Sequence, residues 1–222
     1  GYISILAGAL AGAAVILALL IIFSSLVRGT TMLLIVGIMI SYLSSSVISL
    51  LNFFSTQEGV HSYVIWGLGN FSGVTTDSLP AFSIIIIAGM VWAMLMAKPL
   101  NALLLGTRYA ENLGVNIRRT RNELLLITGI LTAAATAFCG PIAFVGLVVP
   151  HIARLLLNSS NHNILLPATV LAGADIALLC QLISVLPASS IGIIPINAIT
   201  PAIGVPVIIY IILNREKIQY FN

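Results

Sequence analysis

Few side chains in this sequence could carry out chemistry on their own. The chain has no GxxxxGK(S/T) segment, so it lacks the loop that usually holds the phosphates of ATP. It has no HExxH segment and no Cys/His cluster, and its two cysteines, Cys139 and Cys180, lie in apolar stretches without metal-ligand spacing. We therefore expect no catalytic residue, no metal site and no cofactor. Energy for any transport must come from an ion gradient or from a partner that hydrolyses nucleotide.

Two further features could indicate an enzyme or a pump. Gly69-Asn-Phe-Ser-Gly73 resembles the turn of an intramembrane serine protease, but its spacing is not GxSxG, and His61 and His151 fall on opposite sides of the predicted membrane. Asp175 is the only acidic residue deep inside an apolar run, where an ionisable group is costly. A proton relay usually needs several such groups. We therefore expect Asp175 to be a buried carboxyl that is hydrogen-bonded to a neighbouring helix.

The composition predicts an all-α polytopic membrane protein. Mean hydropathy is +1.15, and only 7% of residues are charged, whereas about a quarter are charged in soluble domains. Apolar runs near the length of about 20 residues that crosses a bilayer occur seven times: Tyr2–Phe23, Met32–Asn52, Leu79–Ala97, Leu124–Phe138, Ile142–Leu157, Ile164–Leu186 and Ala198–Leu213. The fourth and fifth runs are short and separated only by Cys139-Gly-Pro141, which predicts a tight turn or an interrupted helix.

Basic residues are placed asymmetrically along these spans. If the seven spans alternate in direction, all nine Lys and Arg residues lie on, or at the edge of, one side, and Glu58 and Asp77 lie on the other. The positive-inside rule makes the basic side cytoplasmic and puts residue 1 outside. The net charge of +3 therefore reflects topology and does not indicate nucleic-acid binding. The nine residues are Arg28, Lys98, Arg108, Arg118, Arg119, Arg121, Arg154, Arg215 and Lys217.

The sequence begins at Gly1, directly inside an apolar run, with no basic anchor or signal-peptide pattern before it. We expect the chain to be the C-terminal part of a longer protein, with an odd number of spans preceding it. On this interpretation residues 1–222 form one N-terminally truncated transmembrane domain, and residues 98–123 form its large cytoplasmic loop.

This loop carries a disproportionate share of the charge. Six of the fifteen charged residues lie between Arg108 and Glu123. A short helix from Thr107 to Leu113, ended by Gly114, would present an apolar knob with charged edges, which suits a groove on a soluble subunit. Its charged face holds Arg108 and Glu111, and its apolar face holds Tyr109 and Leu113. For the flanking Arg118, Arg119 and Arg121 we expect contacts with anionic headgroups.

Two other stretches contain helix breakers. The first, Gly140 to Arg154, contains two prolines that remove backbone donors, at a depth where broken helices must face protein or a water-filled cavity. We expect this stretch to act as a hinge of the pathway or gate. For His151 we favour a role as a helix-end residue over a role as a ligand. The residues of this predicted hinge are Gly140, Pro141, Gly146, Pro150, His151 and Arg154.

The second stretch, Phe53–Ser78, is too polar to cross lipid, and Tyr63 and Trp66 suit a membrane interface. It is either a solute-facing external lip or an ordinary re-entrant turn. The residues of this predicted lip are Trp66, Gly67, Gly69, Ser72 and Gly73.

Three segments together resemble the FecCD permeases, the membrane subunits of bacterial ABC importers for iron-siderophore complexes, haem and vitamin B12. These segments are Leu105–Arg119, Gly140–Arg154 and Ala198–Tyr210, and the resemblance extends over essentially the whole chain. It implies the type II importer fold, with ten spans and both termini cytoplasmic. It also implies a homodimer that works with two ATP-binding subunits and a periplasmic or lipoprotein substrate-binding protein.

The resemblance also implies roles for particular residues. Residues 108–114 would lie on the helix that docks with the ATPase, although the family often has an acid just after the Leu-Gly that opens this motif. Here Thr107 and Arg108 stand at that place, and the nearby acid is Glu111. The substrate path would run between two copies, lined partly by the span after Thr31 and by the Trp66–Gly73 lip.

The sequence thus predicts an ABC importer permease in the bacterial inner membrane, with an iron-siderophore complex as its cargo. A vitamin B12 or haem permease of the same family is the alternative. An ion-coupled secondary transporter is disfavoured by the single intramembrane acid. A membrane-embedded structural subunit is the remaining possibility.

Overall fold

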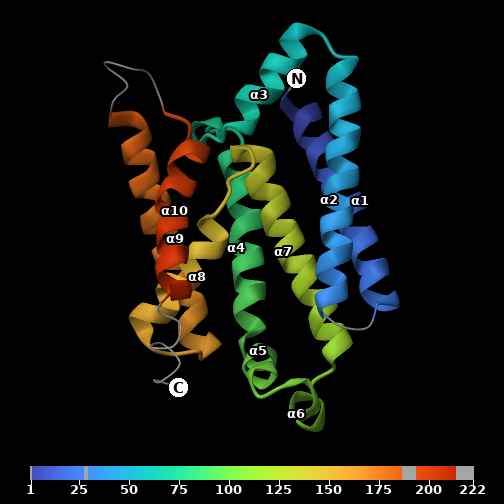
Figure 1. The fold of residues 1–222 in the computed structure, drawn as a ribbon, viewed down its shortest axis with the longest axis vertical. Coiled ribbons are helices and arrows are strands. Elements are labelled where there is room, and N and C mark those ends of the chain that lie inside the picture. Colours follow the sequence, from blue (N-terminus) through green and yellow to red (C-terminus); the bar gives the residue numbers. More distant parts are fainter. Residues whose placement is uncertain (1, 28–29, 187–193, 214–222) are drawn as a thin grey trace.

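A computed structural model describes residues 2–27, 30–186 and 194–213, and these are built from helices and turns, as expected (Figure 1). In chain order the helices are α1 (Tyr2–Leu26), α2 (Thr30–Phe53), α3 (Gln57–Gly67), the 3-10 helix η1 (Phe71–Gly73), α4 (Leu79–Leu95), α5 (Ala97–Leu104), α6 (Thr107–Asn112), α7 (Ile117–Cys139), α8 (Val145–Leu157), α9 (His162–Val185) and α10 (Ile196–Leu213).

A helix lies at each of the seven predicted spans, but not all of these helices are long enough to cross a membrane. Within the described ranges four helices are long and apolar enough to cross a membrane, namely α1, α2, α7 and α9. A fifth span is possible if α4 and α5, which meet at a 44° bend, are counted as one. The two remaining helices, α8 and α10, are shorter.

The clearest departure from the predicted spans is α8, expected from Ile142 but beginning only at Val145. Its 13 residues correspond to about 20 Å of helix, less than the roughly 30 Å of a hydrocarbon core. The segment before it is irregular because Gly140 and Pro141 end the helical path.

The helices form one layered bundle (Figure 1). α7 packs against both α1 and α4, and α2 lies on the outer side of α1. On the opposite side α8, α9 and α10 pack against one another, and α9 also contacts α4 and α5. A buried cluster of Ala137, Phe138 and Cys139 lies where α7 ends, and the rings of Phe138 and Phe82 are 5.0 Å apart.

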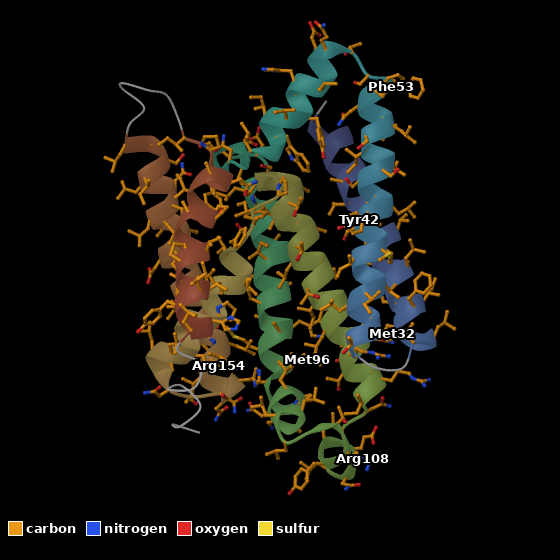
Figure 2. All side chains as sticks on the ribbon, viewed as in Figure 1. Met32, Tyr42, Phe53, Met96, Arg108 and Arg154 are labelled. Carbon is orange, nitrogen blue, oxygen red and sulfur yellow. The ribbon has the colours of Figure 1, made fainter. Side chains whose placement is uncertain are left out.

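The described basic residues gather at one end of the bundle. Arg108 and Arg154 both lie at the end that carries α5 and α6, whereas Phe53 and α3 lie at the other end (Figure 2). Glu58, in the first turn of α3, belongs to this second end. This arrangement matches the predicted charge asymmetry, so we call the two ends cytoplasmic and external. Arg28, Arg215 and Lys217 lie outside the described residues.

Candidate functional site

An open groove of about 1100 Å³ runs along α2. Its walls come from α1, α2, α3, α7 and the segment after α7. The α2 wall is mixed, and its polar side chains are Ser41, Ser44, Ser45, Ser49 and Asn52. The other residues along it are Ile16, Leu20, Leu34, Gly37, Ile38, Ile40, Ile48, Tyr63, Thr136 and Pro141.

The serine hydroxyls have partners within their own helix. Ser41 donates to the carbonyl of Gly37 at 3.0 Å, and Ser44 donates to the carbonyl of Ile40 at 2.9 Å. A hydroxyl that donates in this way keeps oxygen lone pairs available to a solute. Sequence reasoning predicted α2 as part of the path but missed these side chains. The signal was present, since five serines fall between positions 41 and 49 of a predicted span.

The external end of the groove is bounded by two regions that the sequence predicted separately. Tyr63, on α3, belongs to the predicted stretch Phe53–Ser78, and its ring centroid lies 5.9 Å from that of Trp66, a residue of the predicted lip. Pro141 comes from the predicted hinge. The lip and the start of the hinge therefore meet at the mouth of one cavity.

Backbone contacts hold the lip directly against the end of α7. The amide of Asn70 donates to the carbonyl of Cys139 at 2.8 Å. Gly140 has φ +76°, and a Cβ added there would lie 2.4 Å from the carbonyl oxygen of Trp66. A Cβ at Gly73 would lie 2.7 Å from the carbonyl oxygen of Phe138. These approaches leave no room for side chains, so Gly73 of the lip and Gly140 of the hinge serve one close junction.

Asn197, near the start of α10, completes this junction. Its side-chain amide donates to the carbonyl of Gly67 at 2.9 Å and to that of Pro141, and its side-chain oxygen accepts from the amide of Ala143 at 3.1 Å. Sequence reasoning missed Asn197, because a single polar residue at the start of an apolar run carries no local signal of its distant partners.

The backbone break of the predicted hinge lies at residues 140–144 and not at Pro150, where a break was also expected. Phe144 has φ 68°, an unusual value for a bulky residue. From Val145 the helix continues through Pro150 to Leu157. The ring of a helical proline crowds the carbonyl of the residue four positions earlier, here Gly146, yet the helix has no interruption at Pro150.

Among the described residues, the cytoplasmic half of the predicted hinge holds no cluster of side chains that could bind a metal ion. His151 is exposed, and its Nδ1 lies 2.8 Å from the carbonyl oxygen of Leu147 in the preceding turn. Arg154 lies in the last turn of α8, where a cation is favoured by the helix dipole. Neither residue approaches the external junction.

At the cytoplasmic end, α6 has the predicted form. It spans Thr107–Asn112, and Gly114 follows with φ +85°. The amide of Val115 donates to the carbonyl of Ala110 at 3.0 Å, which is the bond of a Schellman helix end. Ala110 is fully buried against the rest of the loop, whereas Arg108 and Glu111 are exposed.

The exposed apolar surface of this loop is larger than predicted. Tyr109 is 54% exposed and Leu113 is 58% exposed, and the same loop also exposes Leu104, at the end of α5, and Leu105, which follows it. We call these four side chains the apolar knob. Figure 2 places Arg108 at the far cytoplasmic tip of the molecule. The knob therefore lies where a soluble partner could reach it.

Two of the flanking arginines have partners within the chain. Arg119 forms an ion pair with Glu123 at 2.7 Å, and Arg121 donates to the backbone carbonyl of Ser24. Ser24 is fully buried and also donates to Asn122 at 3.2 Å. Arg121 therefore fastens the start of α7 to the end of α1.

A polar cluster links the loop to α9. The side-chain amide of Asn101, on α5, donates to Asn161 at 2.9 Å. The side-chain oxygen of Asn101 accepts from the backbone amide of His162 and lies 2.9 Å from His162 Nδ1. We call these three residues the α5–α9 clasp.

The structure corrects the expectation for Asp175. Its side chain is exposed on the outer face of α9, and it has no hydrogen-bond partner within the ranges that the structure describes. The expected bond to a neighbouring helix is therefore absent from this part of the chain. Which face of a helix is covered depends on its neighbours, and the sequence of α9 alone did not reveal them.

Apolar helices of membrane-spanning length, with a groove along α2 and an exposed helical loop at one end, define a polytopic membrane protein. The chain belongs to the FecCD transport family, whose model matches residues 1–214. The resemblance drawn from three sequence segments is thus confirmed.

Individual relatives agree with this assignment. The chain is 34% identical over 215 residues to the vitamin B12 import system permease protein BtuC of Vibrio cholerae, covering 96% of this chain and 64% of the relative. The BtuC protein of Salmonella typhi is also 34% identical, over 94% of this chain and 63% of the relative. A solved inward-facing structure of a metal-chelate type ABC transporter matches with a TM-score of 0.79 and 33% identity, over 90% of this chain and 63% of that one. The chain thus spans slightly less than two thirds of the length of these relatives.

Proposed function

We propose that this chain is the membrane-spanning permease subunit of an ABC importer in the bacterial inner membrane, and that its cargo is an iron-siderophore complex. A cytoplasmic ATP-binding subunit hydrolyses ATP, and a periplasmic or lipoprotein binding protein delivers the cargo. Family membership and the structural neighbour of the metal-chelate type support this proposal.

The observation that carries the proposal is the groove along α2. Its volume of about 1100 Å³ is at the upper limit of ordinary small-molecule sites, which range from about 300 to 1,000 Å³. Its polar wall is made of neutral hydroxyl and amide groups. Such groups can pair with an oxygen-rich chelate without binding it so tightly that it cannot leave, which conduction requires.

A second copy of the chain supplies the opposite wall of the path in this proposal. The outer surface of α2 has few contacts within the chain, and Tyr42 and Leu43 are 70% and 64% exposed. A polar stripe bordering an apolar helix surface suits an interface in which apolar residues pack and serines face the path.

Vitamin B12 is the second candidate cargo, because the two relatives described above are named as vitamin B12 permeases. The neutral groove wall suits this large, polar metal complex as well as it suits an iron chelate.

The class of transporter is tested by purifying the full-length protein in mild detergent from its native host. We expect a soluble ATPase to co-purify in stoichiometric amount. A preparation that contains the permease alone and transports its solute with an ion gradient would contradict the ABC assignment.

The cargo is tested by uptake in cells that lack the gene. Radiolabelled iron bound to a panel of siderophores, haem, and radiolabelled vitamin B12 are each supplied, with the complemented strain as the reference. We expect loss of one iron-siderophore activity and unchanged uptake of vitamin B12. Loss of vitamin B12 uptake alone would support the second candidate.

A further inference from the structure

Asn197 connects three segments that are far apart in the sequence. Its side-chain nitrogen donates to Gly67 on α3 and to Pro141 after α7, and its side-chain oxygen accepts from Ala143. Its backbone amide donates to the carbonyl of Leu68 at 3.2 Å. All the hydrogen-bonding groups of the side-chain amide are therefore used, and each partner is a backbone group.

The partners of Asn197 belong to the walls of the groove mouth. Pro141 lines the groove directly, and Gly67 ends the helix that carries Tyr63. Gly140 lies so close to Trp66 that the lip and the irregular segment at residues 140–144 must move together. A single side chain on α10 thus fixes both walls of the external mouth and ties them to α10.

The bonds require the chemistry of an amide. Two donors and one acceptor on the same planar group are available from Asn but not from Asp, which when ionised only accepts. The adjoining backbone is also held in an uncommon state, since Phe144 has a positive φ next to the bonded Ala143. Such a conformation persists when its surroundings over-determine it, and the bond from Ala143 to Asn197 supplies one such constraint.

We propose that Asn197 is a positioning residue that restricts how far the external mouth of the groove can widen, so that the mouth widens further only when α10 moves. The inference rests on the proposed function for its role in transport, but the restriction itself can be measured without any cargo.

The test uses Ser49→Cys, which places a thiol on the α2 wall of the groove. Cys139 and Cys180 are both buried, at 6% and 1% exposure, so they contribute little background. In the full-length protein in intact cells, the rate at which a membrane-impermeant maleimide labels this thiol, which is exposed in the groove, sets the reference. Adding Asn197→Asp should speed labelling at least fivefold, because the carboxylate loses both donors and faces two carbonyl oxygens.

Asn70→Asp is the matched control. Asn70 lies at the same junction and only accepts through its side chain, from the amide of Ser72 at 2.8 Å. Aspartate preserves that cap, so the same charge change there should leave labelling unchanged. Equal labelling in the Asn197→Asp, Asn70→Asp and parent proteins would overturn the proposal.

A second variant guards against misfolding. If Asn197→Asp does not reach the membrane, Asn197→Ala is used instead, because it removes the same bonds without adding charge. The ratio of its labelling rate to that of the parent protein then tests the proposal. Faster labelling together with lost chelate uptake supports both the restriction and the transport role. Faster labelling of the variant, when the parent protein itself moves no chelate, would refute the proposed function while leaving the restriction in place.

Discussion

The side-chain oxygen of Asn101 accepts a hydrogen bond from the backbone amide of His162 at 2.7 Å. This bond joins α5, which leads directly into the apolar knob, to the first turn of α9. A displacement of α6 by a docked subunit would therefore reach α9 through a short, polar connection as well as through packing. The clasp offers a route from the loop to the helices at the far side of the bundle.

We expect Asn101→Ala to reduce uptake several-fold while the ATPase remains bound. The substitution removes the bonds to Asn161 and His162 but leaves the knob untouched. The measurement is the ratio of ATP hydrolysed to cargo transported in proteoliposomes, which should rise. Asn163→Ala, an exposed change in the same turn of α9, should leave the ratio unchanged. An unaltered ratio for Asn101→Ala would remove the clasp from the coupling route.

The two glycines of the predicted hinge should respond oppositely to alanine. Gly140→Ala imposes a Cβ on a residue with φ +76° and directs it at the backbone of Trp66. We expect a loss of at least about 2 kcal/mol in stability, since both the conformation and the contact are unfavourable. Thermal unfolding of the detergent-solubilised protein measures this loss.

Gly146→Ala provides the control in the same stretch. Gly146 is helical, and a Cβ there meets nothing within 4 Å. Replacing a helical glycine by alanine usually raises stability by up to about 1 kcal/mol. A similar loss for both variants would mean that the close approach at Gly140 is not what limits substitution.

Helix positions were predictable because apolar length and turn chemistry are local properties. α6 ended where Gly114 was expected to end it, and the irregular backbone fell at Gly140 and Pro141. Tertiary features were not predictable in the same way. Nothing near Asn197 in the sequence points to Gly67, and the periodicity of α9 does not tell whether Asp175 faces a neighbour. The helix runs through Pro150 without a break, which the residue type alone did not reveal.

Topology can be tested with one thiol at each end. Thr76→Cys, between η1 and α4, should react in intact cells with an impermeant reagent, and Asn112→Cys, at the end of α6, should react only after permeabilisation. Both residues are exposed. Asn116 is a poorer choice for the cytoplasmic probe because its side chain caps α7 by accepting from Arg119 at 2.9 Å. Labelling of both sites from outside would contradict the assignment of the two ends.

The apolar knob makes the sharpest prediction for the proposed partner. Leu113 is 58% exposed and lies at the end of α6, so Leu113→Asp should cost little folding free energy, as is usual for exposed positions. A charge at this position would have to be desolvated in an apolar contact, which costs several kcal/mol if it is unpaired. We therefore expect the variant to remain folded and dimeric while it releases the ATPase and loses uptake. Co-purification in detergent, together with uptake in cells, measures both effects.

Asn112→Asp is the matched control for this prediction, because it adds the same charge one residue away without entering the knob. It should retain most ATPase binding. If Leu113→Asp binds the ATPase and supports uptake as well as Asn112→Asp does, the knob is not the docking surface. The exposed side chains Arg108 and Glu111 would then be the next positions to exchange, because they lie on the other face of the same helix.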